Sequence, residues 1–404
     1  MWCCEEVGCA GGGGGSFTYG PYTYKFSNKA YGKGSSILGG VDNKAYGNYS
    51  FIGGGGGYSA GTPGYTGTYS YGNKASGLRS TVINGHLNIA NEYHSAVIGG
   101  KQNHSYGYYS LIGNGSGNTV TGKKSSIING SNNSIIGVYS FIGGGGGSYW
   151  NGYYVVNLGN TISGIYSSIL GGQSNTITNS GSSIVGGNGN KIYSGNSFIG
   201  GGVGNNIYSN HSVIGGGRSN RTLGNMSAIA GGQANRAQGS ASFIGGCLSN
   251  VASGLNSSVL NGSGNTASGQ RSFIGNGKSN VASGYVNSFV GSGNYNLSTG
   301  LMSAILNGIE NEASSDYTGV LNGVRNRATG QFAIILGGAD NLVNGVGGFI
   351  GNGQNNQSSN KYSFVGTGVK NKTFSDFSTI LNGSGNTIGV NARAASILAG
   401  TGHT

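Results

Sequence analysis

The sequence is poor in charge, in proline and in cysteine. Of 404 residues only 7% are charged, 2 are Pro and 4 are Cys, whereas 88 are Gly. Low charge together with regularly spaced Ile, Val, Leu and Phe argues against disorder, which needs weak hydrophobicity and high net charge. Glycine at this level without a Gly-X-Y triplet excludes collagen. The composition therefore predicts a folded chain.

Long apolar runs are also absent, so we expect no membrane span. The N-terminal residues MWCCEEVGC carry acids where a secretory signal has a basic region, and this predicts that there is no standard signal peptide. The excess of 21 basic over 9 acidic residues is modest for the length of the chain and predicts only weak attraction to polyanions. Because no nucleic-acid-binding module accompanies that charge, we expect no nucleic-acid partner.

Three of the four cysteines, Cys3, Cys4 and Cys9, crowd the first nine residues, and Cys247 stands alone. They are too few and too close together for a disulfide framework. A zinc site needs about four ligands, and no His lies near the cluster. Two readings stay open, inter-chain disulfides through Cys3, Cys4 and Cys9, or inert thiols. We expect no cofactor and no metal.

A 15-residue phrase recurs along most of the chain. One copy is SFIGGGVGNNIYSNH (197–211), and its residues define positions 1 to 15 of the repeat. The chain holds 23 copies, and 18 of the 22 intervals between their starts are 15 residues long. Position 3 is Ile or Val in all copies, position 6 is Gly in all but one (Cys247), and position 9 is Asn in all but the last, which has His403. A short fixed period means that each copy is one coil of a stack.

Alternation with period two and glycine punctuation predict two short strands in each coil. The first is S-x-I-x (the Ser strand) and the second is N-x-A-x (the Asn strand). Fifteen residues with two corners predict an all-β parallel β-roll, a narrow β-solenoid, about 110 Å long at ~4.8 Å per coil. We expect the position 9 amides to stack as a ladder that satisfies turn backbone groups. The ladder is represented by Asn103, Asn118, Asn133, Asn205, Asn265 and Asn326.

The Ser strand is apolar on its outward positions 2 and 4 as well as inside. Where position 2 is Phe, position 4 is always Gly, and where position 4 is bulky, position 2 is usually small. We interpret this volume trade as tight packing against a second surface, because a soluble monomer rarely exposes so long an apolar ridge. The ridge predicts a homo-oligomer, with a trimer suiting a wedge-shaped roll. The expected interface residues are Phe51, Phe141, Phe198, Phe243, Phe273, Phe289, Phe349, Phe364, Leu260 and Leu306.

The segments SFIGNGKSNVASG (272–284) and SSVLNGSGNTASG (257–269) resemble the head repeats of trimeric autotransporter adhesins, which read S-x-A-I-G-x-x-A-x-A-x-G. That resemblance covers residues 28–404 and implies a trimer of left-handed parallel β-rolls. The repeats also look like those of viral and phage fibres. The half-turn GSGNTVTG (115–122) additionally resembles plant ice-binding β-rolls.

Three segments interrupt the period, at 11–27, 56–72 and 146–159, each Tyr-rich and each entered through a run of glycines. We therefore divide the chain into an N-terminal segment, 1–27, and a repeat domain, 28–404, with two loop insertions. Insertions on one face of a solenoid often carry binding, and Tyr and Trp suit sugar rings. The loops either bind surface glycans or cap and dock the N-terminal end. The candidate ligand residues are Tyr65, Tyr69, Tyr149, Trp150 and Tyr153.

Other candidate sites are weaker. Eight basic residues directly follow the repeat Asn and predict a loose cationic stripe, which either attracts anionic glycans or is a solvated face. Glu310 and Glu312 alternate on one predicted strand, so their carboxylates share a face and could lie within the distance that glycosidases use. Two solvated charges are the simpler interpretation. His94 and His211 share one coil position.

The sequence therefore predicts a structural fibre or adhesin rather than an enzyme, on a virion or at the cell surface. The alternatives are an ice-binding roll, for which Thr119/Thr121 and Thr176/Thr178 give short Thr arrays, and a glycan-cleaving tailspike. By its pattern the first copy begins at the Asn strand, at Asn28, and the last stops after a Ser strand. The ends therefore predict complementary half-coils that stack end to end into filaments.

Overall fold

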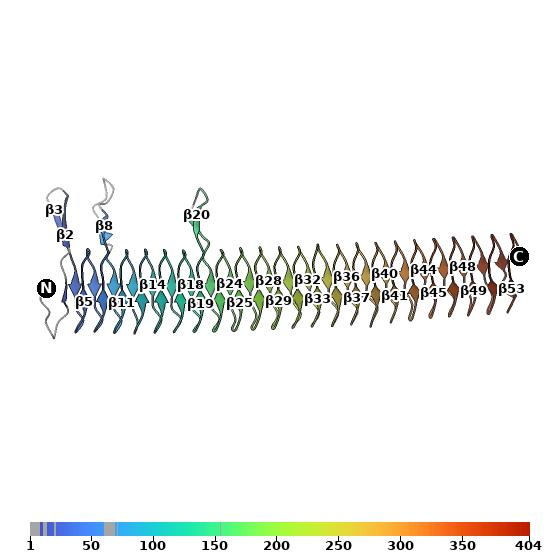
Figure 1. The fold of residues 1–404 in the computed structure, drawn as a ribbon, viewed down its shortest axis with the longest axis horizontal. Helices are drawn as coiled ribbons and strands as arrows, with labels where there is room; N and C mark the ends of the chain where they lie inside the picture. Colours follow the sequence, from blue (N-terminus) through green and yellow to red (C-terminus); the bar gives the residue numbers. More distant parts are fainter. Residues whose placement is uncertain (1–8, 11–13, 20–21, 60–68, 71, 154) are drawn as a thin grey trace. The chain divides into compact units, whose positions relative to one another are not determined.

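The computed structural model describes residues 9–10, 14–19, 22–59, 69–70, 72–153 and 155–404, with only the backbone described for those before Ser27 and for 58–59 and 69–70. The chain divides into two units, Met1–Gly204 (unit 1) and Asn205–Thr404 (unit 2). Each unit is a stack of coils of the same kind (Figure 1), and the described residues contain β-strands and turns but no helix. The predicted all-β parallel solenoid, with 15-residue coils and two short strands in each, is confirmed.

In unit 1 the Ser strands are β1 (Cys9–Ala10), β5 (Ser36–Ile37), β7 (Phe51–Ile52), β11 (Thr81–Val82), β13 (Ala96–Val97), β15 (Leu111–Ile112), β17 (Ser126–Ile127), β19 (Phe141–Ile142), β23 (Ser168–Ile169), β25 (Ser183–Ile184) and β27 (Phe198–Ile199). Its Asn strands are β4 (Lys29–Ala30), β6 (Lys44–Ala45), β10 (Lys74–Ala75), β12 (Ile89–Ala90), β14 (His104–Ser105), β16 (Thr119–Val120), β18 (Ser134–Ile135), β22 (Thr161–Ile162), β24 (Thr176–Ile177) and β26 (Lys191–Ile192).

In unit 2 the Ser strands are β29 (Val213–Ile214), β31 (Ala228–Ile229), β33 (Phe243–Ile244), β35 (Ser258–Val259), β37 (Phe273–Ile274), β39 (Phe289–Val290), β41 (Ala304–Ile305), β43 (Gly319–Val320), β45 (Ile334–Ile335), β47 (Phe349–Ile350), β49 (Phe364–Val365), β51 (Thr379–Ile380) and β53 (Ser396–Ile397). Its Asn strands are β28 (Asn206–Ile207), β30 (Arg221–Thr222), β32 (Arg236–Ala237), β34 (Val251–Ala252), β36 (Thr266–Ala267), β38 (Val281–Ala282), β40 (Leu297–Ser298), β42 (Glu312–Ala313), β44 (Arg327–Ala328), β46 (Leu342–Val343), β48 (Gln357–Ser358), β50 (Lys372–Thr373) and β52 (Thr387–Ile388).

Each strand pairs in parallel with the same strand of the next coil, so identical repeat positions stack in columns. Ile112 lies beside Ile127, for example, and Val120 beside Ile135. The core of a coil consists of four inward positions: the Ser at position 1, the Ile or Val at position 3, the Asn at position 9 and the small or β-branched residue at position 11, nearly all fully buried. Half of this narrow core is therefore polar, and its stability depends on hydrogen bonds as much as on apolar burial.

The N-terminal end of unit 1 differs from the sequence-based expectation. Strand β1 pairs in parallel with β5, with Cys9 beside Ser36 and Ala10 beside Ile37, so it is the Ser strand of an additional coil that continues at β4. The prediction that the first copy begins at its Asn strand is wrong. The residues Cys-Ala at positions 2 and 3 do not match the repeat, which is why the sequence pattern missed this coil. The complementary half-coils on which the filament expectation was based are therefore not present.

The two corners of the coil require left-handed backbone. Position 6 has a positive φ in every described coil, which explains its glycine, and Cys247 adopts φ 61° in the one coil that lacks it. A side chain at this glycine would also collide with the next coil: a Cβ on Gly115 would lie 2.0 Å from the carbonyl oxygen of Gly130. Position 7 adds a one-residue parallel bridge between coils, as in His86 beside Lys101, which the two-strand reading did not anticipate.

Three hairpins interrupt unit 1, and they rise from the same side of the stack in Figure 1. They are β2 (Gly14–Tyr19) with β3 (Tyr22–Ser27), β8 (Tyr58–Ser59) with β9 (Tyr69–Ser70), and β20 (Ser148–Trp150) with β21 (Val155–Asn157), all antiparallel. They correspond to the three predicted insertions. The corner between the Ser strand and the Asn strand, which we call the hairpin corner, is therefore distinct from the opposite corner at positions 13–15.

Candidate functional surfaces

The asparagines at position 9 form a continuous hydrogen-bonded column within each unit. The backbone N–H of Asn118 donates to Oδ1 of Asn103 at 3.1 Å, and that of Asn133 donates to Oδ1 of Asn118 at 3.0 Å. Nδ2 of Asn103 donates to the carbonyls of Gly99 in its own coil and Gly115 in the next, both at 2.9 Å. One side chain thus satisfies three backbone groups and joins two coils.

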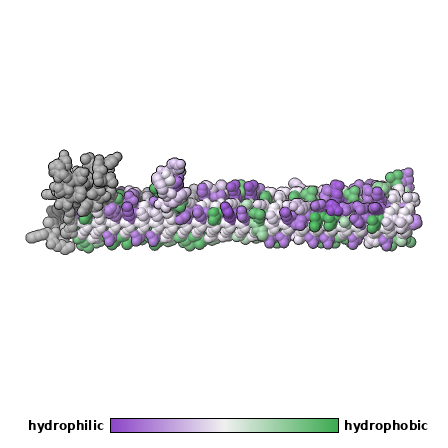
Figure 2. Space-filling view, turned by 90° about the horizontal axis from the view of Figure 1, so that it is seen from above, coloured by the Kyte–Doolittle hydropathy of each residue, from purple (hydrophilic) through white to green (hydrophobic). Residues whose placement is uncertain are grey.

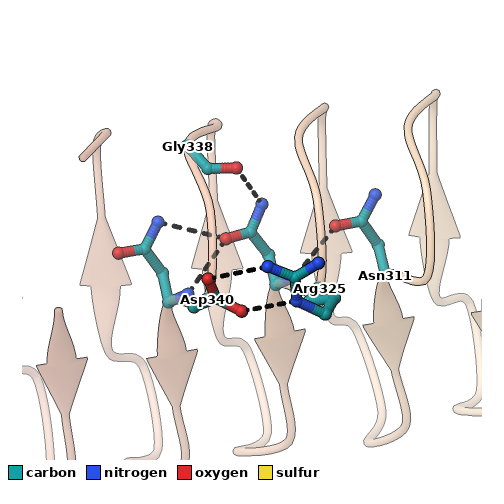
Figure 3. Close-up of polar contacts among 6 residues, drawn as sticks. Asn311, Arg325, Gly338 and Asp340 are labelled. Carbon is teal, nitrogen blue, oxygen red and sulfur yellow. Dashed lines mark hydrogen bonds and ion pairs between the residues drawn. The ribbon is translucent and has the colours of Figure 1, made fainter. Parts of the chain in front are cut away.

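The same bonds recur at the other asparagines expected to form the ladder. In unit 2, Asn326 donates to Gly338 at 2.9 Å and receives the N–H of Asn341 at 3.1 Å (Figure 3). Asn205 and Asn265 accept the backbone N–H of the next Asn in the same way. Direct amide-to-amide bonds occur at some steps only, such as Asn118 to Asn103 at 3.0 Å. The column therefore bonds mainly to backbone, and it is structural.

The Ser-strand face presents the apolar ridge. Its members at positions 2 and 4 are exposed or half-buried in the single chain: Phe198 is 39% exposed, Phe243 37%, Leu260 44% and Leu306 50%. The remaining expected interface residues, Phe51, Phe141, Phe273, Phe289, Phe349 and Phe364, are half-buried. Adjacent rings stack along the ridge, with centroids 5.4 Å apart for Phe273 and Phe289 and 5.0 Å apart for Phe349 and Phe364.

The glycines at position 4 of this face lie close to the next coil. Where position 2 is Phe, a Cβ on the following Gly would lie close to that ring, 3.5 Å from Cε1 of Phe51 at Gly53. The same Cβ would lie 2.5 Å from the carbonyl oxygen of Ile83 in the next coil, closer than real Cβ atoms come. The same close approach recurs where position 2 is not aromatic, as at Gly113 and Gly215, so it does not account for the trade. Packing against a second surface therefore stays a prediction, and the exposure of the ridge supports it.

The opposite corner carries an exposed aromatic column that the sequence reading missed. Its residues occupy position 15 with left-handed φ between 52° and 59°: Tyr49, Tyr109, Tyr139, Tyr166, Tyr317, Phe332, Tyr362 and Phe377. Neighbouring rings stack, with centroids 5.0 Å apart for Tyr139 and Tyr166 and 5.1 Å apart for Tyr317 and Phe332. Left-handed backbone costs a non-glycine residue about 1–2 kcal/mol, and ring stacking returns about 0.5–1.5 kcal/mol. The signal was available in the repeated aromatic residue directly before the repeat Ser.

The hairpins place part of the candidate ligand residues in solvent. Trp150 is 63% exposed, Tyr153 88% and Tyr149 53%. Tyr65 lies outside the described residues, and Tyr69 is described only as backbone in β9. Figure 2 looks onto the side from which the hairpins rise, and it shows hydrophilic and hydrophobic residues interspersed there, without a continuous apolar band.

Glycines hold the base of the β20–β21 hairpin. Gly146 has φ 75° and pairs with Ser131 of the preceding coil, so the hairpin leaves from an undisturbed bridge. At the return, a Cβ on Gly159 would lie only 1.7 Å from the carbonyl oxygen of Asn132, and Gly72 has the same spacing to Asp42 at the second insertion. These glycines let the chain leave and re-enter the coil without displacing the Asn column.

The outer face of the Asn strand carries charge in two arrangements. Each of the eight basic residues that follow the repeat Asn opens its strand, which forms a column: Lys29, Lys44, Lys74, Lys191, Arg221, Arg236, Arg327 and Lys372. In unit 2, Arg327 pairs with Glu312 of the preceding coil at 2.8 Å. Arg325 makes two bonds to Asp340, at 2.7 and 3.0 Å (Figure 3), and these hold the pKa of the Asp340 carboxyl below its ordinary value. Glu312 thus forms an ion pair between coils. The hydrogen bond and charge of Asp340 raise the pKa of Arg325, and the charge of Glu310 adds a smaller effect in the same direction.

Shallow furrows also lie on this face. The one in unit 1 has a volume of about 460 Å³ and is lined by Lys44, Lys74, Gln102, His104 and Thr119, among others. Burial lowers the pKa of His104. A furrow of about 540 Å³ in unit 2 runs past Lys370 and Lys372, and one of about 330 Å³ lies between Tyr208, Arg221 and Arg236.

The described residues hold no group of three or more His, Cys, Asp or Glu that could bind a metal, and no helix among them could span a membrane. Cys247 is exposed with a free thiol. Cys3 and Cys4 lie outside the described residues, and Cys9 is described only as backbone in β1, so the inter-chain disulfide stays a prediction. His94 and His211 occupy the position 15 column, where His94 stacks on Tyr109 with centroids 5.2 Å apart.

No protein-family model matches the chain, and a search of curated proteins finds no significant relative.

Proposed function

We propose that the protein is a structural fibre: a homotrimer of left-handed β-rolls that forms a rigid rod on a virion or cell surface and attaches to glycans through its hairpins. The exposed apolar ridge carries this proposal. In unit 2 the ridge follows 13 Ser strands, about 60 Å at ~4.8 Å per coil. Soluble monomers rarely leave contiguous apolar surface on that scale uncovered.

A second copy of the same chain is the partner that fits the ridge best. The ridge repeats every 15 residues, so a surface with the same repeat meets it in register along its whole length. Rotation about an axis parallel to the stack brings identical columns together, and closed symmetry limits growth to a defined oligomer. A threefold axis suits a roll whose apolar face is one narrow side.

Mass measurement by light scattering tests the proposal, with two matched variants. Phe273→Asp puts a charge on the ridge, where burial in a dry interface is costly. Phe377→Asp makes the same change at an exposed ring of the opposite corner. We expect a trimer for the wild type and for Phe377→Asp, and a weakened trimer for Phe273→Asp. A wild-type chain that runs as a monodisperse monomer contradicts the proposal.

Ice binding is the second candidate, and one array favours it. Thr119, Ser134, Thr161 and Thr176 stack in register on consecutive coils and form a row of hydroxyls on the outer face. Lys191 ends the row on the next coil. A short hydroxyl array supports at most weak activity, and a thermal-hysteresis measurement at millimolar concentration decides between the two candidates. Fragment release from bacterial or algal polysaccharides tests the tailspike alternative in the same way.

A further inference from the structure

The first coils of unit 1 carry three lysines stacked on one column of the outer face. Lys29 lies in register beside Lys44, and Lys44 beside Lys74. Neighbouring strands are about 4.8 Å apart, and like charges directly opposite each other destabilise a sheet. One carboxylate among the described residues offsets them, Asp42, whose Oδ2 lies 3.5 Å from Nζ of Lys44.

One stretch of unit 2 shows that the same columns accommodate charge at lower electrostatic cost, whereas Arg221 and Arg236 lie side by side elsewhere in that unit. There Glu312 lies beside Arg327 on the next coil, and Arg325 binds Asp340 across one coil step. Alternating signs turn the repeat into a row of ion pairs. The lysine column lacks such alternation, so its electrostatic repulsion is relieved best by an anion from outside the chain.

The residues around the column form a polar site rather than an open charged surface. Tyr31 and Tyr46 follow the lysines by two residues on the same strands, and their rings stack with centroids 4.9 Å apart. Nζ of Lys74, from the coil on the other side, lies 5.4 Å from the Tyr46 ring centroid. Beside Lys44 and Lys74 runs the furrow of about 460 Å³, along which Gln102, His104 and Thr119 provide amide, imidazole and hydroxyl groups. Leu87 and Ile89 add apolar surface to its lining, beside Gly72 and Gly117.

We propose that this surface, formed by Lys29, Lys44, Lys74, Tyr31, Tyr46 and the adjoining furrow, binds an acidic polysaccharide. Ammonium groups pair with carboxylate or sulfate substituents, and the amide and hydroxyl side chains bond to sugar hydroxyls. The site lies on the roll itself, next to the return of the β8–β9 hairpin at Gly72. The inference rests on the proposed surface-binding role of the fibre and names the class of glycan, but it does not depend on the trimer.

The aromatic geometry favours a polysaccharide over a single-stranded nucleic acid. Bases bind such surfaces by stacking on free ring faces. The two faces of Tyr46 are covered, one by the ring of Tyr31 and the other by Lys74. The hydroxyl groups and ammonium groups that remain suit hydrogen bonds and ion pairs instead.

Titration calorimetry tests the site with four probes: heparin as a sulfated chain, polygalacturonate as a carboxylated chain, dextran as a neutral one, and oligothymidylate. The variant Lys29→Gln/Lys44→Gln/Lys74→Gln removes the column. The matched control, Lys191→Gln/Lys278→Gln/Lys372→Gln, removes the same charge from lysines on other coils. Lys29→Arg/Lys44→Arg/Lys74→Arg keeps the charge and shows whether loss of binding comes from misfolding, as does the melting temperature of each variant.

We expect the full chain to bind at least one acidic polysaccharide and not dextran, with binding weakened by added salt. The Gln column variant should lose about threefold or more in affinity, because three ion pairs are removed together. The control should stay within about twofold, and the Arg variant should bind like the wild type. Equal losses in the column and control variants, or no binding to either acidic chain, overturn the proposal. If oligothymidylate binds more tightly than both acidic polysaccharides, the proposal is wrong about the ligand, and the site binds single-stranded nucleic acid instead. Because light scattering reports the oligomer separately, failure here is distinguishable from failure of the fibre proposal.

Discussion

Long insertions occupy one corner of the coil in unit 1, and short ones occupy the other corner in unit 2. The hairpins of unit 1 all leave after a Ser strand, where Gly146 and Gly159 keep the coil closed behind them. In unit 2 the coil that ends at Asn287 has one extra residue, and the coil that ends at Ala394 has two. Both coils bulge at the opposite corner, where Tyr285 is 84% exposed and Val390 is 71% exposed. In both places the Asn column continues without interruption. Insertions at either corner therefore leave the hydrogen bonds of the Asn column intact.

The largest expected effect tests whether the column contributes equally in the two units. Asn103→Ala and Asn326→Ala each leave one backbone N–H and one carbonyl without a partner. The second carbonyl, of Gly115 or Gly338, keeps the bond from Lys101 N–H or Val324 N–H. At about 1–3 kcal/mol for each unsatisfied group, we expect each variant to lose roughly 3 kcal/mol or more of unfolding free energy, measured by urea denaturation.

The exposed position 7 asparagines, changed by Asn188→Ala and Asn294→Ala, are the controls, and their stability should change by less than about 0.5 kcal/mol. A much smaller loss at Asn103 than at Asn326 breaks the comparison, because it means that the coils of unit 1 are held by something else.

The second prediction concerns position 8, where the coil of the β20–β21 hairpin has Gly159 and one regular coil has Gly385. Gly159→Ala forces a Cβ against the carbonyl oxygen of Asn132, whereas a Cβ on Gly385 meets nothing within 4 Å and suffers only from φ 67°. We expect a loss of roughly 2–4 kcal/mol for Gly159→Ala and about 1 kcal/mol for Gly385→Ala. If the two variants have equal melting temperatures, the backbone at Gly159 is not as close to the carbonyl oxygen of Asn132 as the structure shows.

Hairpin exchange is the third test. Replacing residues 146–159 by Gln-Ser, the pair at 173–174 of the next coil, should leave the melting temperature within a few degrees and abolish attachment to the target surface. Placing 146–159 in exchange for residues 354–355 of unit 2 should give a folded chain, because the corner geometry is the same. Trp150→Ala/Tyr153→Ala is the milder variant. If the chain without residues 146–159 still attaches to the target surface, this hairpin does not carry the binding and has a structural role.

The smallest effect follows from the Arg325–Asp340 pair. Because the folded state lowers the pKa of Asp340, its contribution to stability is present above the ordinary carboxyl pKa of about 4 and is lost as pH falls through the lowered value. NMR titration should show the lowered pKa in the wild type and its return in Arg325→Gln. Added salt should weaken this pair while it relieves the lysine column of unit 1, so salt should shift local hydrogen exchange in opposite directions in the two regions.

The sequence predicts the parts of this fold that repeat. Position 3, position 6 and the Asn at position 9 recur so regularly that the strands, the left-handed glycines and the amide column follow from spacing alone. Strand β1 was missed because Cys9 and Ala10 take a place in the stack through backbone pairing, which tolerates residues outside the pattern. The left-handed column at position 15 was missed because Tyr and Phe rarely adopt positive φ, and only the inter-coil bond from Tyr109 N–H to the Tyr93 carbonyl, with ring stacking, holds them there.

The candidate surfaces were partly predictable for a related reason. The ridge follows from apolar residues on both faces of one strand, but the close approach of Gly53 to the next coil is contained in no spacing rule. Which charges lie beside which is equally invisible until coils are stacked. The lysine column and the Glu312–Arg327 pair use the same repeat position, and only their neighbours distinguish them.

The hydrogen bonds of the Asn column also bear on how such a gene can change. Each coil offers its neighbour the same acceptor and takes the same donor, so duplication or loss of one whole repeat leaves the adjoining coils bonded as before. Changes of other lengths are confined to the two corners, outside the Asn column. Fibre length can then drift by unequal recombination between near-identical repeats, while the decorated corners diversify independently of it.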